Sequence, residues 1–380
     1  MLAIKLIFAG LVLILAAFVL RRPPKGQAKT AYGAVLRSGT AFVLGLGFTA
    51  ALIGFGANRA QIVRDGPYAQ IAANALHTVK EDPAPYVLFV GASYSRNAIN
   101  DKSLTRRLRA HGYNQRVITF ALEGASLQER DLRLRQFLRT APRPPDVVFL
   151  EASPEFDRAA THGFVIAKFS ERVIGQFDPR GTFWALRGLS MGAPDGLVDL
   201  AKNTVLLALH VPLNWLNVGL FNEAVRLQDA PKLASYDPQS TPRREVTDDD
   251  RQSGLRQIVP PVEHIYAWGE KFRASQRAML KKAGVRRIAY YFPPVIDPHE
   301  RAYLAAICLA HPDTPCVAPQ DANMLAALDG PVWFDEEHLL APGAAIYGRW
   351  LAGKVMASGV LGTPEDHPKL ALRTAGGKTP

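Results

Sequence analysis

Short apolar runs alternate with longer amphipathic segments along most of the chain after residue 85. The apolar runs predict strands at 86–90, 116–121, 143–153, 286–292 and 331–334. The amphipathic segments predict helices at 104–111, 127–139, 265–283, 297–306 and in the second half of 335–359. Strands and helices that alternate in short steps are typical of a parallel sheet with helices on both faces. The pattern therefore predicts an α/β fold.

The alternation stops at about 158–260, which predicts an insertion in the α/β domain. Its apolar part, 203–221, could be a third membrane helix. Four residues argue against a membrane helix: His210, Pro212, Asn214 and Asn217. A helical insertion over a ligand site or against the membrane surface fits the pattern, and a helical hairpin in the core fits it equally. The polar stretch 237–254 predicts a solvated loop.

Two apolar runs precede this domain, at 2–20 and 38–57, and Lys5 is the only charge in them. Each is close to the roughly 20 residues that a helix needs to cross a bilayer core. Five basic residues lie between the runs: Arg21, Arg22, Lys25, Lys29 and Arg37. Because basic loops stay in the cytoplasm, we expect two transmembrane helices and an outward-facing chain after them. A cleaved signal peptide is the alternative, but the densest basic cluster follows the first run.

These patterns divide the 380 residues into four parts. We expect two membrane helices with a basic cytoplasmic loop in 1–57, a connector with a short helix in 58–85, the α/β domain in 86–362 and a disordered tail in 363–380. Hydrophobic residues make up 48% of the chain and charged residues 21%, so a domain of this length can bury a full core.

A formal charge of +11 indicates an anionic partner, which could be nucleic acid, lipid headgroups or an acidic polysaccharide. The sequence has no zinc knuckle and no RNA-binding signature of aromatic and basic residues, so we expect no nucleic-acid partner. The glycine-rich stretch 45–56 resembles a nucleotide-binding fingerprint, but it lies inside a predicted membrane span. We expect no cofactor.

The chain has two cysteines, Cys308 and Cys316. Their close spacing favours a disulfide in an oxidising compartment, and two buried free thiols are the alternative. A metal site is disfavoured because two thiols need further ligands, and none is arranged nearby.

Candidate catalytic residues follow the predicted strands. Parallel α/β sheets bind ligands at the carboxyl ends of their strands. Ser93 follows the first predicted strand, Gly124 the second and Ser153 the third, while Asp335 and His338 follow the last. If the strands are assigned correctly, these five residues converge on one edge of the sheet.

The combination of residue types predicts a Ser-His-Asp triad. A serine hydroxyl is a weak nucleophile that needs a base, and His338 can take the proton of Ser93. Asp335 lies three residues before His338 and can orient its ring. The backbone N–H groups of Ser93 and Gly124 and the Ser153 side chain could stabilise an oxyanion. Each residue alone has another explanation, since Ser93 could cap a helix and Asp335 could belong to an acidic helix start.

The same residues give the chain a resemblance to the SGNH, or GDSL, hydrolase superfamily. Gly-Ala-Ser-Tyr-Ser at 91–95 is similar to the first motif of the family, Glu-Gly-Ala-Ser at 123–126 to the second, and Asp-Glu-Glu-His at 335–338 to the last. The resemblance covers about 86–153 and 283–361. It implies a flavodoxin-like sheet, ester hydrolysis or acyl transfer, and Ser93 as the nucleophile.

Two departures from the family pattern stand out. Ala92 replaces the usual Asp before the serine, a change that is common in membrane-anchored branches. The third motif lacks its usual Asn, and Ser153 is the nearest positional match. The chain resembles two membrane-anchored groups, the alginate O-acetylation proteins and the D-alanyl lipoteichoic acid transfer protein. This resemblance implies a multipass membrane O-acyltransferase as partner.

We therefore predict a serine esterase or O-acyltransferase in the bacterial inner membrane, with two membrane passes and its C-terminal domain in the periplasm. Its substrate would be an ester, principally an O-acetyl group, on an envelope polysaccharide or another acylated glycan. The alternative is a catalytically inactive glycan-binding or scaffold subunit that partners a membrane O-acyltransferase. The altered third motif motivates this alternative.

Overall fold

The structure is a computed structural model. It describes residues 67–157, 178–191, 197–216, 236–243, 246–262 and 264–363, with a few positions between 37 and 52. The two predicted membrane helices lie almost wholly outside these residues, and so do the predicted tail and much of the insertion. Within the described part of the chain, no helix combines the length and apolar character that a bilayer crossing requires.

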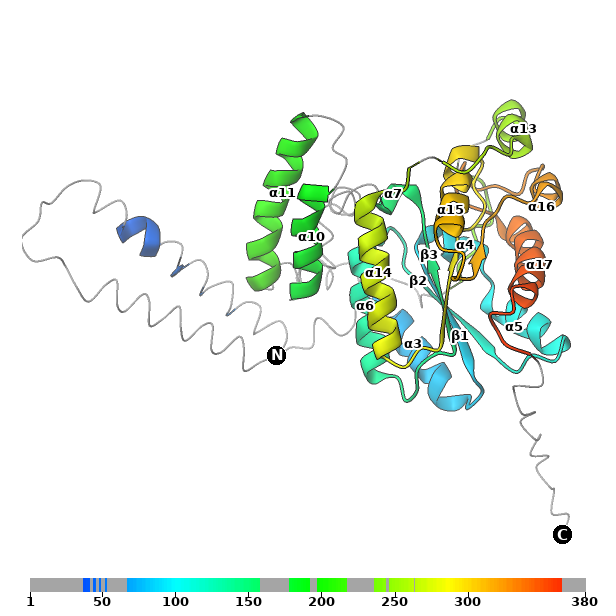
Figure 1. Ribbon diagram of the computed structural model, residues 1–380, viewed down its shortest axis with the longest axis horizontal. Coiled ribbons are helices and arrows are strands. Elements are labelled where there is room, and N and C mark those ends of the chain that lie inside the picture. The colour runs from blue at the N-terminus through cyan, green and yellow to red at the C-terminus, as the bar shows by residue number, and fades with distance from the viewer. Residues whose placement is uncertain are drawn as a thin grey trace, which may run out of the picture.

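Five parallel strands form the centre of the fold (Figure 1). They are β1 (Tyr86–Gly91), β2 (Arg116–Ala121), β3 (Val147–Glu151), β4 (Arg287–Tyr291) and β5 (Cys316–Val317). Their order across the sheet is β2-β1-β3-β4-β5. The chain leaves β1 toward β2 and then returns to β3 on the other side. The α/β prediction is confirmed, and this change of direction creates the crevice in which such sheets bind ligands.

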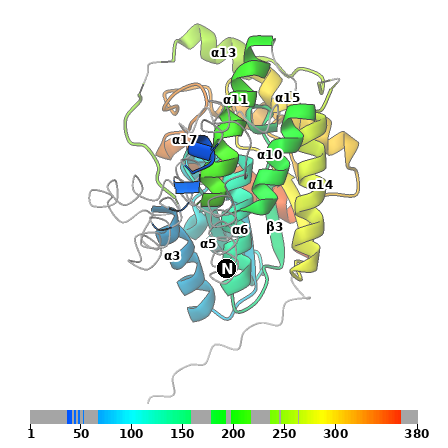
Figure 2. The same ribbon diagram turned by 90° about the vertical axis from the view of Figure 1, so that its left-hand side faces the viewer.

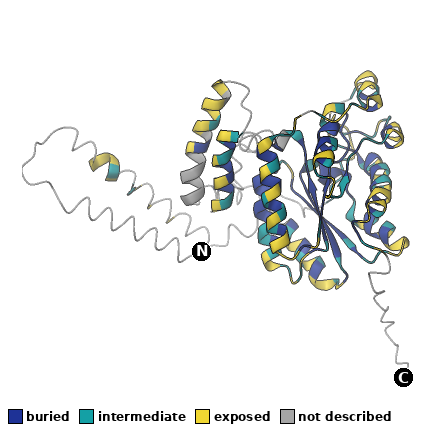
Figure 3. Cartoon of the chain, viewed as in Figure 1, coloured by how far each residue is buried: buried dark blue, intermediate teal, exposed yellow. Residues whose placement is uncertain are grey.

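The strand sequences are apolar throughout because helices cover both faces of the sheet. In β1, Leu88 and Val90 belong to the core on one face, and Val87 and Phe89 to the core on the other. Figure 3 shows that burial is concentrated in the sheet and on the sides of the helices that face it.

Two layers of helices flank the sheet (Figure 1). One layer contains α3 (Pro67–Glu81), α6 (Leu127–Thr140), α14 (Ala267–Lys282) and α15 (Pro298–Ala310). The other contains α5 (Asp101–Ala110), α16 (Ala322–Ala327) and α17 (Ala341–Ala357). Asp297 caps α15, as the sequence predicts, because its side chain accepts a hydrogen bond from the His299 N–H.

Helix α3 lies in the predicted connector at 58–85, yet it is part of the core. Its residues Ile71, Ala75 and Val79 are buried among the side chains of the first layer. Their spacing of four residues places them on one helical face. The end of this segment is therefore packed against the domain.

Helices make up most of the described part of the insertion. Helix α10 (Pro179–Met191) packs on α6 and α14, where the Trp268 indole donates to the Trp184 carbonyl at 3.0 Å. Helix α11 (Leu197–Leu216) packs beside α10 (Figures 1 and 2). The predicted solvated loop at 237–254 is wrong in its second half, which begins α13 (Asp248–Arg256). Thr247 caps this helix and three aspartates fill its first turn, which favours a helix start.

The predicted last strand at 331–334 is also wrong. There, Trp333 makes only an isolated bridge to Leu339, and the fifth strand of the sheet is β5 instead. The segment is apolar because Trp333 is buried in the second layer, with its indole N–H donating to the Leu328 carbonyl at 2.9 Å.

A disulfide joins Cys308 in α15 to Cys316 in β5. The cysteine spacing favoured this bond, and the structure confirms it. It fixes the short connection between the last core strand and the helix before it.

Replacing both cysteines by serine (Cys308→Ser with Cys316→Ser) should lower the free energy of unfolding by about 2–3 kcal/mol, because the bond restricts the unfolded chain. Urea unfolding followed by tryptophan fluorescence measures the change. A reductant should destabilise the wild type by a similar amount and leave the variant unaffected. Equal unfolding midpoints for wild type and variant would contradict this expectation.

Candidate active site

Ser93 is the first residue of the short helix α4 (Ser93–Ala98), directly after β1. The cap position belongs to Ala92, and no side chain caps the helix. Ser93 is therefore not a helix cap. Its Oγ lies 2.9 Å from Nε2 of His338, a residue 245 positions away in the chain.

The other ring nitrogen of His338, Nδ1, lies 2.7 Å from Oδ1 of Asp335. The carboxylate can only accept, so this contact places the ring proton on Nδ1 and leaves Nε2 as the acceptor for the Ser93 hydroxyl. The structure thus joins the three residues in the order serine, imidazole, carboxylate. The His338 side chain is 15% exposed and that of Asp335 22%, so the group is open to solvent on one side.

A tight loop at 334–338 holds Asp335 and His338 together. Oδ1 of Asp335 also accepts the backbone N–H groups of Glu337 at 3.0 Å and His338 at 2.9 Å. The Phe334 N–H donates to the His338 carbonyl at 2.8 Å and closes the loop. This closed loop, and not the end of a strand as predicted, brings Asp335 and His338 together.

The charge state of Asp335 follows from these contacts. Partial burial alone raises its pKa, but the hydrogen bond and charge of His338 and the two backbone N–H groups together lower the pKa below its usual value. The carboxylate therefore stays ionised through neutral and mildly acidic pH. Its contribution to stability is present above the unfolded-state pKa and is lost as the pH falls through the lower folded-state pKa.

Tyr94 supports the imidazole from one side. Its ring stacks on the His338 ring, with centroids 5.1 Å apart and planes 12° from parallel. Its hydroxyl donates to Glu337 at 3.3 Å, across the same loop. The residue after the serine therefore limits the rotation of His338, a role that the motif alone does not reveal.

A buried carboxylate, Glu151, lies behind the turn that carries Ser93. Its Oε2 accepts the Ala92 N–H at 3.0 Å and the Ser95 hydroxyl. Its Oε1 accepts from the Arg130 guanidinium at 2.9 Å, and the two side chains are 0% and 2% exposed. Glu151 was not among the predicted site residues. The available signal was a charged residue at the end of an otherwise apolar buried strand.

The hydrogen bonds continue from Ser95 to Tyr291 at the end of β4, with 2.5 Å between their oxygens. Burial, and next the charge of Glu151, raise the pKa of Tyr291 well above its usual value, so its hydroxyl remains protonated. Gly91 completes the arrangement, because a Cβ there would collide with Ser95 Oγ and Glu151 Oε2. Three neighbouring strands thus hold the turn before the candidate nucleophile.

Gly124 and Ser153 lie at the same edge of the sheet. Gly124 has a φ of +58°, in the left-handed region that favours glycine. The turn that contains it starts beside β1, where the Leu122 N–H donates to the Gly91 carbonyl at 3.0 Å. Ser153 is 1% exposed, and its hydroxyl has no hydrogen-bond partner among the described residues. The proposed oxyanion roles of both residues stay predictions.

Part of the insertion borders this site. Asp237 accepts from the buried Arg96 of α4 at 2.6 Å, and Arg96 also contacts Glu123 beside Gly124. Gln239 forms a bridge with Leu340, just after the His338 loop. The segment 236–243 therefore connects the helix that begins at Ser93 with the chain just after the His338 loop.

No protein-family model matches the chain, and a search of curated proteins finds no match. Within the described residues, no group of three or more His, Cys, Asp or Glu side chains could hold a metal ion.

Glu151→Gln should lower the free energy of unfolding by about 3–5 kcal/mol, because it removes the buried carboxylate that the buried Arg130 guanidinium contacts. The double variant Arg130→Met/Glu151→Gln removes both charges and should recover most of this loss. Urea unfolding measures both.

The exposed Glu81 offers a control, since Glu81→Gln should change stability by no more than about 0.5 kcal/mol. A double variant as unstable as Glu151→Gln alone would show that the ion pair is not the cause.

Proposed function

We propose that this chain is a serine ester hydrolase or O-acyltransferase of the SGNH type. The observation that carries the proposal is the chain of contacts from Ser93 through His338 to Asp335, at 2.9 and 2.7 Å. Both distances are within the hydrogen-bond reach that a nucleophile, its base and an orienting carboxylate need. The strand order, which is that of flavodoxin-like sheets, also supports the resemblance to this superfamily.

In the proposed reaction, Ser93 Oγ attacks the acyl carbon of an ester while His338 Nε2 takes its proton. The tetrahedral intermediate then collapses, the bond to the alcohol oxygen breaks, and His338 returns the proton to the leaving alcohol. Water or a second alcohol attacks the acyl-serine, again losing its proton to His338. The bond between the acyl carbon and Ser93 Oγ then breaks, His338 returns the proton to Oγ, and the acid or the new ester leaves.

The surroundings of Ser93 supply candidate donors for the oxyanion. The first N–H groups of a helix have no acceptor within the helix, and Ser93 is the first residue of α4. The Ala92 N–H is occupied by Glu151, so it is not such a donor. We propose that the Ser153 hydroxyl takes the place of the Asn that the third motif lacks, with the Gly124 N–H as the third donor.

We further propose that the substrate is an acylated glycan of the cell envelope and that the chain is anchored in the inner membrane with this domain in the periplasm. The two apolar runs support the anchoring, and the disulfide Cys308–Cys316 fits an oxidising compartment. The charge of +11 favours an anionic glycan. A multipass O-acyltransferase partner follows only from the resemblance.

The second candidate is an inactive scaffold of the same fold that binds the glycan. The absence of Asn from the third motif favours it. An ordered serine–histidine contact favours the enzyme instead, because a scaffold has no need for it. The two candidates differ in whether the purified protein forms an acyl-enzyme.

Ser93→Ala should abolish covalent labelling by a fluorophosphonate probe, because the probe needs an activated serine oxygen. Labelling is read by gel fluorescence on the purified full chain. Ser253→Ala, at an exposed serine of α13, is the matched control and should label like the wild type. Undiminished labelling of Ser93→Ala would rule out Ser93 as the nucleophile, and an unlabelled wild type would favour the scaffold.

Asp335→Asn should lower kcat for a small acetyl ester such as p-nitrophenyl acetate by about 10³–10⁴-fold, because the amide no longer holds the required tautomer of His338. The KM should change little, since Asp335 does not touch the acyl group. Steady-state kinetics separates the two constants. A kcat equal to that of the wild type would contradict an orienting role for Asp335.

A further inference from the structure

A second feature lies at the opposite edge of the sheet. A pocket of about 480 Å³ is bounded by the last turns of α14, the start of β4 and the segment 310–315 before β5. These are the amino ends of the strands, whereas Ser93 follows a carboxyl end. The pocket therefore does not belong to the site described above.

The lining of this pocket is strongly cationic. Its charged residues are Arg277, Lys281, Arg286, Arg287 and a single carboxylate residue, Asp313, which give a formal charge of +3 with His311 neutral. The Arg287 guanidinium donates to the Val360 carbonyl at 3.2 Å, on the other face of the sheet, so the side chains of Arg277, Lys281 and Arg286 are the cations considered for the ligand. None of the four cations forms an ion pair with a carboxylate of the described residues. A concave surface lined by one sign of charge concentrates ligands of the opposite sign.

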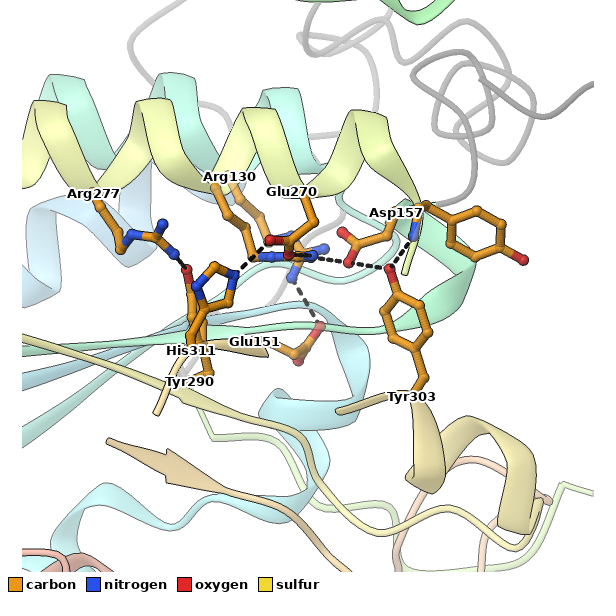
Figure 4. A network of polar contacts seen from close by, with 10 residues as sticks. Arg130, Glu151, Asp157, Glu270, Arg277, Tyr290, Tyr303 and His311 are labelled. Atoms are coloured by element: carbon orange, nitrogen blue, oxygen red, sulfur yellow. Dashed lines mark hydrogen bonds and ion pairs between the residues drawn. The ribbon is translucent and has the colours of Figure 1, made fainter. Parts of the chain in front are cut away.

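Two side chains of the lining, those of Arg277 on α14 and His311 after α15, are held by contacts with their neighbours (Figure 4). Arg277 donates to the hydroxyl of the buried Tyr290, and its guanidinium lies 5.8 Å from the centre of that ring. His311 contacts Glu270 at 2.5 Å, and Glu270 is held in turn by the buried Arg273. Arg277 and His311 are therefore oriented before any ligand binds.

The opposite wall is fixed by covalent and backbone constraints. The disulfide Cys308–Cys316 spans the segment 310–315. The Thr314 N–H donates to the His311 carbonyl, and the Tyr290 N–H to the Pro315 carbonyl, both at 2.9 Å. Binding sites that are ordered in advance lose less conformational entropy when a ligand enters.

We propose that this pocket binds a phosphate group, either free or as part of a phosphorylated molecule. Guanidinium groups donate in a planar fork that matches phosphate oxygens, and an ammonium adds a further charge. A carboxylate ligand needs only one cationic side chain to balance its charge. A phosphate carries up to two charges and several exposed oxygens, so it can contact several cationic side chains at once. The volume exceeds that of the phosphate alone and leaves space for the molecule that carries it.

The test uses the purified full chain in an uncharged detergent, with inorganic phosphate titrated by calorimetry at fixed ionic strength. Lys281→Glu/Arg286→Glu changes two exposed lining residues and should weaken phosphate binding at least about tenfold. Lys80→Glu/Lys102→Glu changes two exposed lysines on α3 and α5 and alters the net charge equally. This control should bind like the wild type.

Two outcomes of the titration would overturn the proposal. One is a wild type that does not bind millimolar phosphate, and the other is equal weakening in both double variants, which would indicate diffuse charge attraction. Ser93→Ala should bind phosphate normally, so the result is independent of the ester chemistry.

Three further ligands distinguish the sources of the group. If dihexanoyl phosphatidic acid binds more tightly than glucose 6-phosphate, and Lys281→Glu/Arg286→Glu loses this binding, the ligand is a lipid headgroup. If glucose 6-phosphate binds more tightly, the ligand is a soluble sugar phosphate. If a galacturonate oligomer binds this pocket more tightly than any phosphate compound, the ligand is an acidic glycan and the phosphate assignment is wrong.

Discussion

A single buried carboxylate, that of Glu151, determines how the turn after β1 is built. Removing a carboxylate from water costs several kcal/mol unless other groups replace its hydration. Here Arg130 supplies the opposite charge, and the Ala92 N–H and the Ser95 hydroxyl supply further donors. The Ala92 and Ser95 donors flank Ser93 in one turn, so satisfying this charge also fixes the position of Ser93. An apolar side chain at 151 would leave the Ala92 N–H and the Ser95 hydroxyl without this acceptor on β3.

The site consists of two parts, one that carries Ser93 and one that carries His338. The serine half rests on the sheet through Glu151 and Tyr291, and the histidine half is a loop closed by its own backbone hydrogen bonds. Tyr94 joins them, because it follows Ser93 in sequence and stacks on His338 in space. The segment 236–243 adds a polar connection through Arg96. Both halves are therefore aligned by packing that is independent of any bound substrate.

The parts of the fold that could be predicted from sequence are those where one local rule dominates. Long apolar runs gave β1 and β2, the Asp297 cap gave the start of α15, and the cysteine spacing favoured the disulfide. The strand at 331–334 failed because burial of Trp333 produces the same apolar signal as a strand. Strand β5 has only two residues, which is too short to show a pattern of apolar and polar positions in the sequence.

In the candidate site, too, some residues could be predicted from sequence and others could not. Ser93, Asp335 and His338 were found because their residue types and order are unusual together, and the structure brings them into contact. Glu151 and Arg130 were missed because a buried ion pair joins residues whose partnership exists only in three dimensions. The cationic pocket was missed for a similar reason, since it combines a helix end, a strand start and a loop.

The distance between Ser93 and His338 along the chain has a consequence for biosynthesis. Ser93 is made early, but its partner lies 245 residues later, and the loop that carries this partner is followed by α17, which packs on α4 and α5. While α17 is still inside the ribosome, it cannot pack on α4 and α5, and the His338 imidazole is not held beside the Ser93 hydroxyl. The contact between Ser93 and His338 therefore forms only when translation of the domain is almost complete.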